Sequence, residues 1–335
     1  MKGAVIRGKG LMPLEDFPDF KPDFGEVIIK ISYCGICGTD VHMYNDDNPY
    51  IGYRPGHEWS GRIVELGEGV EGWKVGDRVV GGVGMPCGKC ADCLQGHFSS
   101  CFNVLLIELA RPGGFAEYTA QKASRLFRIP DEVSDEEAAL VEPIAVGLHG
   151  VQLSGIQVGE SAVILGGGPI GNAHLQFAKL CGASVVYMSE KIRSRAELAK
   201  SVGADEVFDP LEVDLVAEVR QRIPLGPDKV FECAGVGSTI QQAAELVRNQ
   251  GRVLVAGYYV KPVTINPGIW SEKEIDIQMT WGYTRENYHQ VLELLRQKKF
   301  NAKALISEIV PLSRLGDALK DLASPNTQMK VLVRP

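Results

Sequence analysis

Short apolar runs separated by glycine and proline make up the first part of the chain, from Met1 to about Leu140. Runs such as Glu26–Ser32, Ser60–Leu66 and Asp77–Gly81 have the length of strands, and turn-forming residues bound each of them. We therefore predict a β-rich, partly barrel-like domain over this part of the chain.

The pattern changes near Glu142, and from Ser161 onward strand-like apolar runs alternate with segments of helical periodicity. The alternating segments are Ala162–Leu165, Pro169–Cys181, Ser184–Met188, Ser194–Val202, Lys229–Cys233, Thr239–Arg248 and Arg252–Ala256. Such alternation is typical of βαβ units, which build a doubly wound parallel sheet with helices on its faces. We predict a second domain of this α/β class.

The last part of the chain ends the α/β pattern and returns to short strands. Ile275–Trp281 is expected to be the last strand of the parallel sheet, and Glu286–Lys298 to be an amphipathic helix. Ile306–Leu312 and Lys330–Val333 have the pattern of strands again. We predict that residues 1–145 and 284–335 form one domain, into which residues 146–283 are inserted as the other.

Four cysteines are closely spaced in one polar, glycine-containing segment: Cys87, Cys90, Cys93 and Cys101. Such spacing lets four thiolates converge on one tetrahedral Zn²⁺ ion. Cysteines packed as plain apolar residues are the alternative, but the segment between them is too polar for that role. We predict a structural zinc site, because protein atoms would fill all four positions.

A second metal site is expected from residues that lie further apart in the sequence. Cys37, His57, Glu58 and Glu142 come from separate segments of the predicted first domain, and each alone is a weak signal. Together they supply a thiolate, an imidazole and carboxylates, with fewer than four firm ligands. A catalytic zinc requires this, because water or substrate occupies its remaining position.

The remaining three cysteines are predicted to be packed thiols. Cys34 precedes Cys37 by three residues, but no second free cysteine pair completes a zinc site with it. Cys181 ends a predicted helix and Cys233 ends a predicted strand, so both are expected in the core.

A glycine-rich turn follows the strand Ala162–Leu165 and opens a helix. The turn contains Gly166, Gly168, Pro169, Ile170 and Gly171. Gly166 permits a tight turn, Gly168 a close approach to a pyrophosphate, and Gly171 close packing of helix on strand. The free N–H groups of the helix N-terminus favour phosphate, so a dinucleotide is the expected ligand.

Glu190 stands at the end of the next strand, where a carboxylate binds ribose hydroxyls and repels a 2′-phosphate. NAD is therefore expected over NADP. Lys191, Arg193 and Arg195 follow closely and could stabilise a phosphate, so NADP remains the alternative. Ala234, after the fourth strand, is expected near the nicotinamide half of the cofactor.

Composition and charge restrict the partners and the compartment. The chain has 335 residues, a net charge of −7 and no basic stripe, so nucleic acid is not expected. No apolar run approaches the roughly 20 residues of a membrane span, and no signal-peptide pattern opens the chain. Regularly spaced cysteines without an export signal indicate metal binding in a reducing cytoplasm.

These residues and motifs together resemble those of the zinc-containing medium-chain dehydrogenases, over essentially the whole chain. The most specific motifs are GICGTD at 35–40, GHEWSG at 56–61, the four-cysteine segment at 87–101, LVEPIAVGLHG at 140–150 and LGGGPIG at 165–171. The resemblance implies a catalytic domain with a GroES-like fold and an inserted Rossmann domain.

The resemblance also implies the ligands of the catalytic zinc. Cys37 and His57 would bind it, with Glu58 and Glu142 as further or alternating ligands. In ethanol-oxidising members the position of Glu142 usually holds a cysteine. A glutamate at this position resembles the sequences of sorbitol, butanediol and other polyol dehydrogenases.

Thr39 matches the family's hydroxyl that contacts the substrate oxygen, and His42 matches its proton-relay histidine. The expected reaction is hydride transfer between NAD and a secondary alcohol, such as a polyol, sugar alcohol or cyclitol. Each subunit of a homodimer or homotetramer would hold one catalytic and one structural zinc. An aldose 1-dehydrogenase, a threonine or amino-alcohol dehydrogenase, and a non-catalytic NAD-binding protein are the alternatives. Substrate choice depends on loops that include Tyr44–Tyr53 and Arg111–Phe115.

Overall fold

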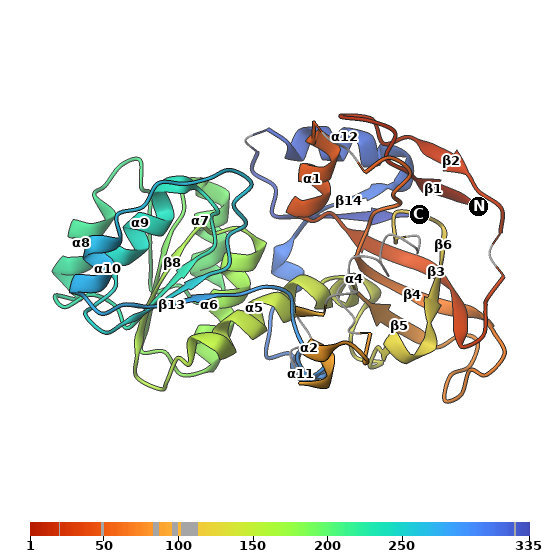
Figure 1. The fold of residues 1–335 in the computed structure, drawn as a ribbon, viewed down its shortest axis with the longest axis horizontal. Coiled ribbons are helices and arrows are strands. Elements are labelled where there is room, and N and C mark those ends of the chain that lie inside the picture. Colours follow the sequence, from red (N-terminus) through yellow and green to blue (C-terminus); the bar gives the residue numbers. More distant parts are fainter. Residues whose placement is uncertain (20, 48–49, 83–86, 96–99, 102–112, 325) are drawn as a thin grey trace. The chain divides into compact units, whose positions relative to one another are not determined.

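A computed structural model gives the fold of the chain (Figure 1). It describes all residues except 20, 48–49, 83–86, 96–99, 102–112 and 325. Parts of the two loops expected to shape substrate choice therefore lie outside the described residues. The described chain divides into two compact units, one of Met1–Glu142 with Tyr283–Pro335 and one of Pro143–Gly282.

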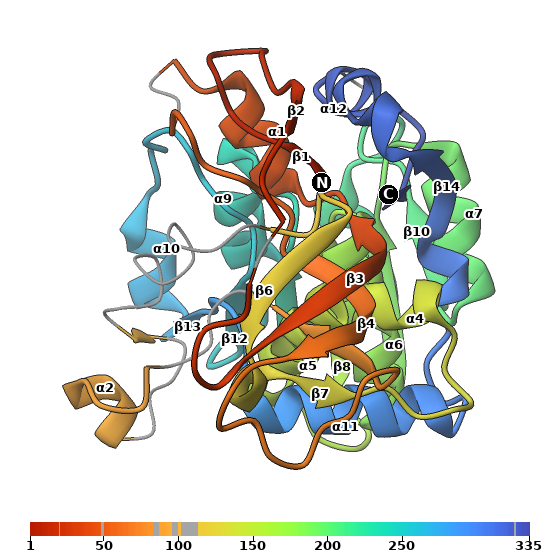
Figure 2. The same cartoon turned by 90° about the vertical axis from the view of Figure 1, so that its right-hand side faces the viewer.

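The first unit is built on a seven-stranded sheet with the order β14-β15-β3-β4-β5-β7, in which β6 also pairs with β3. Its strands are β3 (Glu26–Gly35), β4 (Glu58–Leu66), β5 (Arg78–Gly81), β6 (Tyr118–Lys122), β7 (Phe127–Arg128), β14 (Ile306–Pro311) and β15 (Lys330–Arg334). Figure 2 shows β6, β3 and β4 side by side. A separate antiparallel pair joins β1 (Lys2–Ala4) and β2 (Leu14–Asp16).

The C-terminal strand returns to this unit, as the sequence predicted. In β15, Leu332 pairs with Gly35 and Val333 with Cys34, both in β3. Ile36 N–H extends the contact by donating to the Val331 carbonyl at 3.0 Å. The last residues of the chain are therefore held next to the segment that carries Cys37.

Short helices connect the strands of the first unit. They are α1 (Gly38–Asn45), α2 (Ala91–Leu94), α4 (Asp135–Ala139), α11 (Arg285–Arg296) and α12 (Leu315–Leu322), with 3₁₀ turns η2 (Ala123–Arg125), η3 (Lys303–Leu305) and η4 (Leu312–Arg314). In α11, Val291, Leu292 and Leu295 are buried, which confirms the predicted apolar face. The side chain of Thr284 caps this helix by accepting from Asn287 N–H.

The second unit holds a six-stranded, all-parallel sheet in the order β10-β9-β8-β11-β12-β13. Its strands are β8 (Ser161–Leu165), β9 (Val185–Ser189), β10 (Glu206–Phe208), β11 (Lys229–Glu232), β12 (Arg252–Val255) and β13 (Asp276–Met279). Strand order reverses between β8 and β11, which is where ligands bind in doubly wound sheets. The expected edge strand after Ile275 is β13.

Helices cover both faces of the parallel sheet. They are α6 (Pro169–Leu180), α7 (Arg193–Ser201), α8 (Leu215–Arg222), α9 (Gly237–Leu246) and α10 (Pro267–Glu272); α5 (Val141–Ser154) precedes β8. From β8 the strand order runs outward through β9 to β10 on one side and through β11 and β12 to β13 on the other. Right-handed crossovers in these two directions are expected to put α6 and α7 on one face of the sheet and α8 and α9 on the other. In the part of the chain that is described, no helix is both long and apolar enough to cross a bilayer.

The three cysteines predicted to be packed thiols differ in burial. Cys34 is fully buried, as expected for a packed thiol. Cys181, expected in the core, is exposed, and this prediction was wrong. The helix ends at Leu180, so Cys181 lies beyond its buried face, and Cys233 is only half-buried because β11 ends before it.

Candidate active site and metal centres

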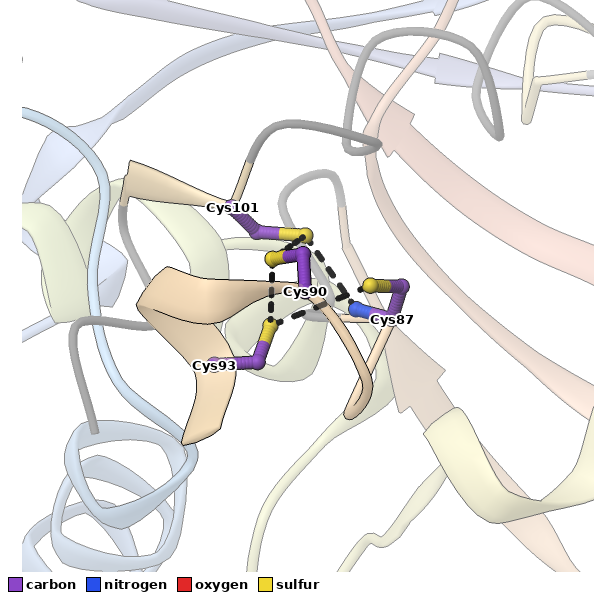
Figure 3. Close-up of side chains that lie close together, drawn as sticks. All are labelled: Cys87, Cys90, Cys93 and Cys101. Carbon is purple, nitrogen blue, oxygen red and sulfur yellow. Dashed lines mark hydrogen bonds between the residues drawn. The ribbon is translucent and has the colours of Figure 1, made fainter. Parts of the chain in front are cut away.

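The four closely spaced cysteines converge on one point (Figure 3). The Cys90 and Cys93 sulfurs lie 3.4 Å apart, Cys90 and Cys101 3.8 Å apart, and Cys87 and Cys93 4.0 Å apart. Four sulfurs around a tetrahedral Zn²⁺ lie about 3.8 Å from one another, because each Zn–S bond is about 2.3 Å. The thiol cluster therefore fits a zinc ion that protein atoms enclose on all sides.

The local chain explains the convergence of these sulfurs. Cys90 is the N-cap of α2, Cys93 lies within that helix, and the Cys101 sulfur accepts from Cys87 N–H at 3.2 Å. Burial, together with hydrogen bonds from the neighbouring thiols, raises the pKa of Cys93 to about 12. A bound cation favours thiolates and would reverse that shift.

A second group of metal-ligand side chains lies where α1 and β4 begin. One ligand atom each from Cys37, His57 and Glu58 lies within 4.8 Å of the others. Cys37 is the N-cap of α1, where the free N–H groups and the helix dipole favour a thiolate. Gly56, with φ +103°, precedes His57; a side chain on Gly56 would crowd the Phe115 backbone.

Asp40 orients this group from inside α1. Its carboxylate accepts from Cys37 N–H at 2.9 Å, and its other oxygen lies 3.8 Å from His57 Nδ1. Burial alone lowers the pKa of His57, but Asp40, Cys37 and Glu142 raise it well above its usual value. A surplus of negative charge around one imidazole is what a divalent cation would neutralise.

Glu142 lies near this group without being one of the three converging ligands. It is buried in the first turn of α5, and its charge acts on both His57 and Lys330. Gly82 lies beside it, and a side chain there would overlap the Tyr288 and Tyr283 hydroxyls and crowd the Glu142 Cγ at 3.1 Å. The structure thus brings Glu58 into the ligand group and keeps Glu142 close by as a fourth candidate.

Thr39 and His42 are both on α1. The Thr39 hydroxyl lies 3.6 Å from the Cys37 sulfur and is half-buried, whereas His42 is exposed in the last turn. Residues three apart lie on one side of a helix, so the two side chains follow each other along α1.

Sequence reasoning missed the basic residue of this site. Lys330, the first residue of β15, is buried, and its Nζ lies 2.7 Å from both carboxylate oxygens of Glu58. No local pattern around Lys330 indicated this role, because its partner is separated from it by 272 positions.

The glycine turn in the second unit has the geometry that a dinucleotide needs. Gly166 has a φ of +98°, and a side chain on Gly171 would overlap the Gly166 carbonyl oxygen. Gly168 is the N-cap of α6 with Pro169 as the first helical residue, and open space surrounds the position of a Gly168 side chain. Ile170 follows in the first turn of α6 and accepts from the buried His174.

Glu190 is hydrogen-bonded to this turn. One oxygen accepts from Gly167 N–H and the other from Ile192 N–H, both at 2.8 Å. Burial lowers the pKa of Arg195, and the nearby Glu190 acts against that shift, so a cation stands close to the carboxylate. The structure thus places Glu190 beside the glycine turn, with Arg195 near enough to interact with it electrostatically.

Ala234 is exposed directly after β11, and a buried carboxylate sets its turn. Glu232 Oε1 accepts from Ala234 N–H and Gly235 N–H at 2.9 Å and from the Thr239 hydroxyl at 2.7 Å. Sequence reasoning did not single out Glu232, because a strand-end glutamate gives no sign of such bonds.

Two family models match the chain. Residues 23–131 match the alcohol dehydrogenase GroES-like domain, and residues 169–297 match the zinc-binding dehydrogenase domain. A 2-dehydro-3-deoxy-L-galactonate 5-dehydrogenase from Pseudoalteromonas atlantica is 36% identical, covering 93% of this chain and 92% of its own length. The (R,R)-butanediol dehydrogenase of Bacillus subtilis is 34% identical, with 100% of each chain covered.

The fold comparison agrees with the sequence comparison. A zinc-binding dehydrogenase structure from Sinorhizobium meliloti, bound to NADP, has a TM-score of 0.93 and 32% identity, covering 100% of this chain and 99% of that one. The chain belongs to the zinc-binding alcohol dehydrogenase family. The expected GroES-like and Rossmann architecture of this zinc-binding alcohol dehydrogenase is confirmed. It is an NAD(P)-dependent oxidoreductase that acts on CH–OH groups.

Proposed function

We propose that this zinc-binding alcohol dehydrogenase interconverts a secondary alcohol of a hydroxyl-rich substrate, such as a polyol, sugar alcohol or cyclitol, with its ketone, and uses NAD. The observation that carries the proposal is the convergence of Cys37, His57 and Glu58 within 4.8 Å. The buried Glu142 beside them makes the donor set rich in carboxylates. Relatives named for butanediol and for a deoxygalactonate support the same substrate class.

The first unit would hold the catalytic metal through Cys37 and His57, with Glu58 or Glu142 as a further ligand. When bound, zinc supplies a Lewis acid that lowers the pKa of an alcohol. The N-terminus of α1 favours the thiolate of Cys37, and Asp40 holds the His57 ring in place.

Thr39 and His42 would move the proton that the alcohol loses. The Thr39 hydroxyl both donates and accepts, and its distance of 3.6 Å from the Cys37 sulfur supports a role beside the proposed metal. His42 is exposed further along α1, so it would pass the proton to solvent.

The second unit would bind the dinucleotide at Gly166, Gly168 and Gly171, with the pyrophosphate at the N-terminus of α6. Glu190 supports NAD, because a buried carboxylate disfavours a 2′-phosphate. Arg195 lies close to it and supports the alternative, as does the similar structure that holds NADP. The four-cysteine cluster would hold a second, structural zinc.

We also propose that the chain forms a homodimer or homotetramer through the edge of its parallel sheet. The edge strand β13 exposes Met279, and Trp281 and Tyr258 beside it are exposed at 62% and 57%. The ring centroids of these two aromatic residues lie 5.6 Å apart. An exposed apolar strand edge favours pairing with a second copy. We further propose a reducing cytoplasm as the compartment, because no disulfide joins any of the eight cysteines, all of which the structure describes.

A substrate screen tests the proposed activity. Purified, never-chelated enzyme is assayed for NADH and NADPH formation with polyols, vicinal diols, cyclitols, aldoses and threonine, with Cys37→Ser as the control. We expect turnover with NAD and one hydroxyl-rich class, and none with Cys37→Ser. NAD binding without turnover on any alcohol would instead support a non-catalytic protein.

A further inference from the structure

The Glu58 carboxylate can bind either of two positively charged partners. One of its oxygens lies within 4.8 Å of ligand atoms of Cys37 and His57, which is the spacing of a shared metal ion. Both of its oxygens also lie 2.7 Å from Lys330 Nζ. An ammonium group and a divalent cation therefore attract the same buried carboxylate.

Lys330 cannot move away from this place easily. Its Nζ also donates to the Ile36 carbonyl at 2.9 Å, and its side chain is 5% exposed. The backbone around it is fixed, because Val331 accepts from Ile36 N–H and Leu332 pairs with Gly35. The C-terminal strand β15 therefore holds the ammonium group of Lys330 at a fixed position near Cys37.

The pocket around the Glu58 carboxylate is fitted to this pair. Gly35 lies against the carboxylate, and any side chain there would overlap Glu58 Oε2. Lys330 Nζ donates to both oxygens of this carboxylate and to the Ile36 carbonyl, so its ammonium group has no other acceptor to gain by leaving Glu58.

We propose that Lys330 is a positioning residue that competes with the catalytic metal for Glu58 and so keeps this glutamate a weakly held ligand. The inference rests on the proposed function, because it requires a metal at Cys37 and His57. If Lys330 only anchored β15, the opposite result is expected: its loss would loosen the metal site and speed the release of zinc.

Rates of zinc release to a chelator separate the two roles. The Cys37-dependent phase of release is identified first, as the phase that Cys37→Ser abolishes. In Lys330→Met, Glu58 loses its competing cation, so we expect this phase to become slower by about tenfold or more. Lys330→Gln, which keeps a hydrogen-bond donor but no charge, should slow it as well and serves if Lys330→Met does not fold.

Lys122→Met is the matched control. Lys122 pairs with the buried Glu26 at 3.1 Å in the same unit, away from the metal ligands, so its loss should leave the release rate unchanged. Release from the Lys330 variants at the wild-type rate, or faster, would overturn the competition. Absence of any Cys37-dependent phase in the wild type would overturn the proposed function itself, and the inference with it.

Discussion

Asn172 fixes the glycine turn of the dinucleotide-binding unit: its side-chain Nδ2 donates to the Gly167 carbonyl at 2.6 Å and to the Gly168 carbonyl at 3.2 Å. The side chain is fully buried in the first turns of α6. It therefore holds the backbone that presents N–H groups to a pyrophosphate, although it need not touch the cofactor itself.

Replacing Asn172 should weaken cofactor binding through the turn. We expect Asn172→Ala to lower the free energy of unfolding by about 1–3 kcal/mol, because two buried carbonyls lose their donor. The dissociation constant for NADH, measured by fluorescence, should rise. Asn45→Ala is the control, because Asn45 donates to the Val41 carbonyl on an exposed part of α1. If Asn172→Ala bound NADH as tightly as Asn45→Ala does, Asn172 would not be needed to hold the turn for cofactor binding.

Alanine substitutions at two glycines of the turn should have different effects on stability. Gly168 has an ordinary φ of −69° and open space around its Cα, so Gly168→Ala should keep its stability to within about 1 kcal/mol. Its added methyl group should still lower NADH affinity, because the pyrophosphate must approach there. Gly171→Ala should lose stability as well, because the methyl group overlaps the Gly166 carbonyl. Calorimetry with NADH titration checks both, and a Gly168→Ala variant that binds NADH normally would count against a phosphate at this turn.

Glu190 should set the choice between NAD and NADP. Glu190→Gln removes the charge that opposes a 2′-phosphate and leaves Arg195 nearby, so we expect the NADP-to-NAD ratio of kcat/KM to rise on the order of tenfold. Glu197→Gln is the matched control, because Glu197 is exposed on α7 and pairs there with Arg193. An unchanged ratio in Glu190→Gln would show that this carboxylate does not select the cofactor.

His174 should make the second unit sensitive to acid. Burial lowers the pKa of His174 to about 4, against an ordinary value of 6.5. Between these two values the unfolded chain binds a proton that the folded chain does not. Stability is therefore present above the ordinary pKa and is lost as pH falls towards 4, by up to about 3 kcal/mol. His174→Asn should flatten that part of the pH profile in urea unfolding; an identical profile would assign the acid sensitivity to other groups.

The fold could be predicted from the sequence because its pattern is local. Helical and strand periodicity placed β8, β9, β11 and β12 to within a residue or two, and the return of the C-terminus as β15 was confirmed. The strand β10 was missed, because three residues are too few for a periodic pattern.

The candidate site could be predicted only in part, for the same reason. Close spacing revealed the cysteine cluster, and the motifs pointed to Cys37 and His57. Nothing local distinguished Glu58 from Glu142, because the distances of their carboxylates from Cys37 and His57 depend on how distant segments fold together. Asn172 and Glu232 were missed because they bond mainly to backbone groups, which every residue carries and which a sequence pattern therefore does not reveal.

The central claim is that a divalent metal occupies a site formed by Cys37 and His57, apart from the four-cysteine cluster. Elemental analysis of never-chelated wild-type, Cys37→Ser and Cys93→Ser proteins, combined with activity, tests it most directly. We predict two zinc ions per wild-type chain and one in each variant, with activity abolished only in Cys37→Ser. One zinc in the wild type, none in Cys93→Ser, and full activity in Cys37→Ser would contradict the account.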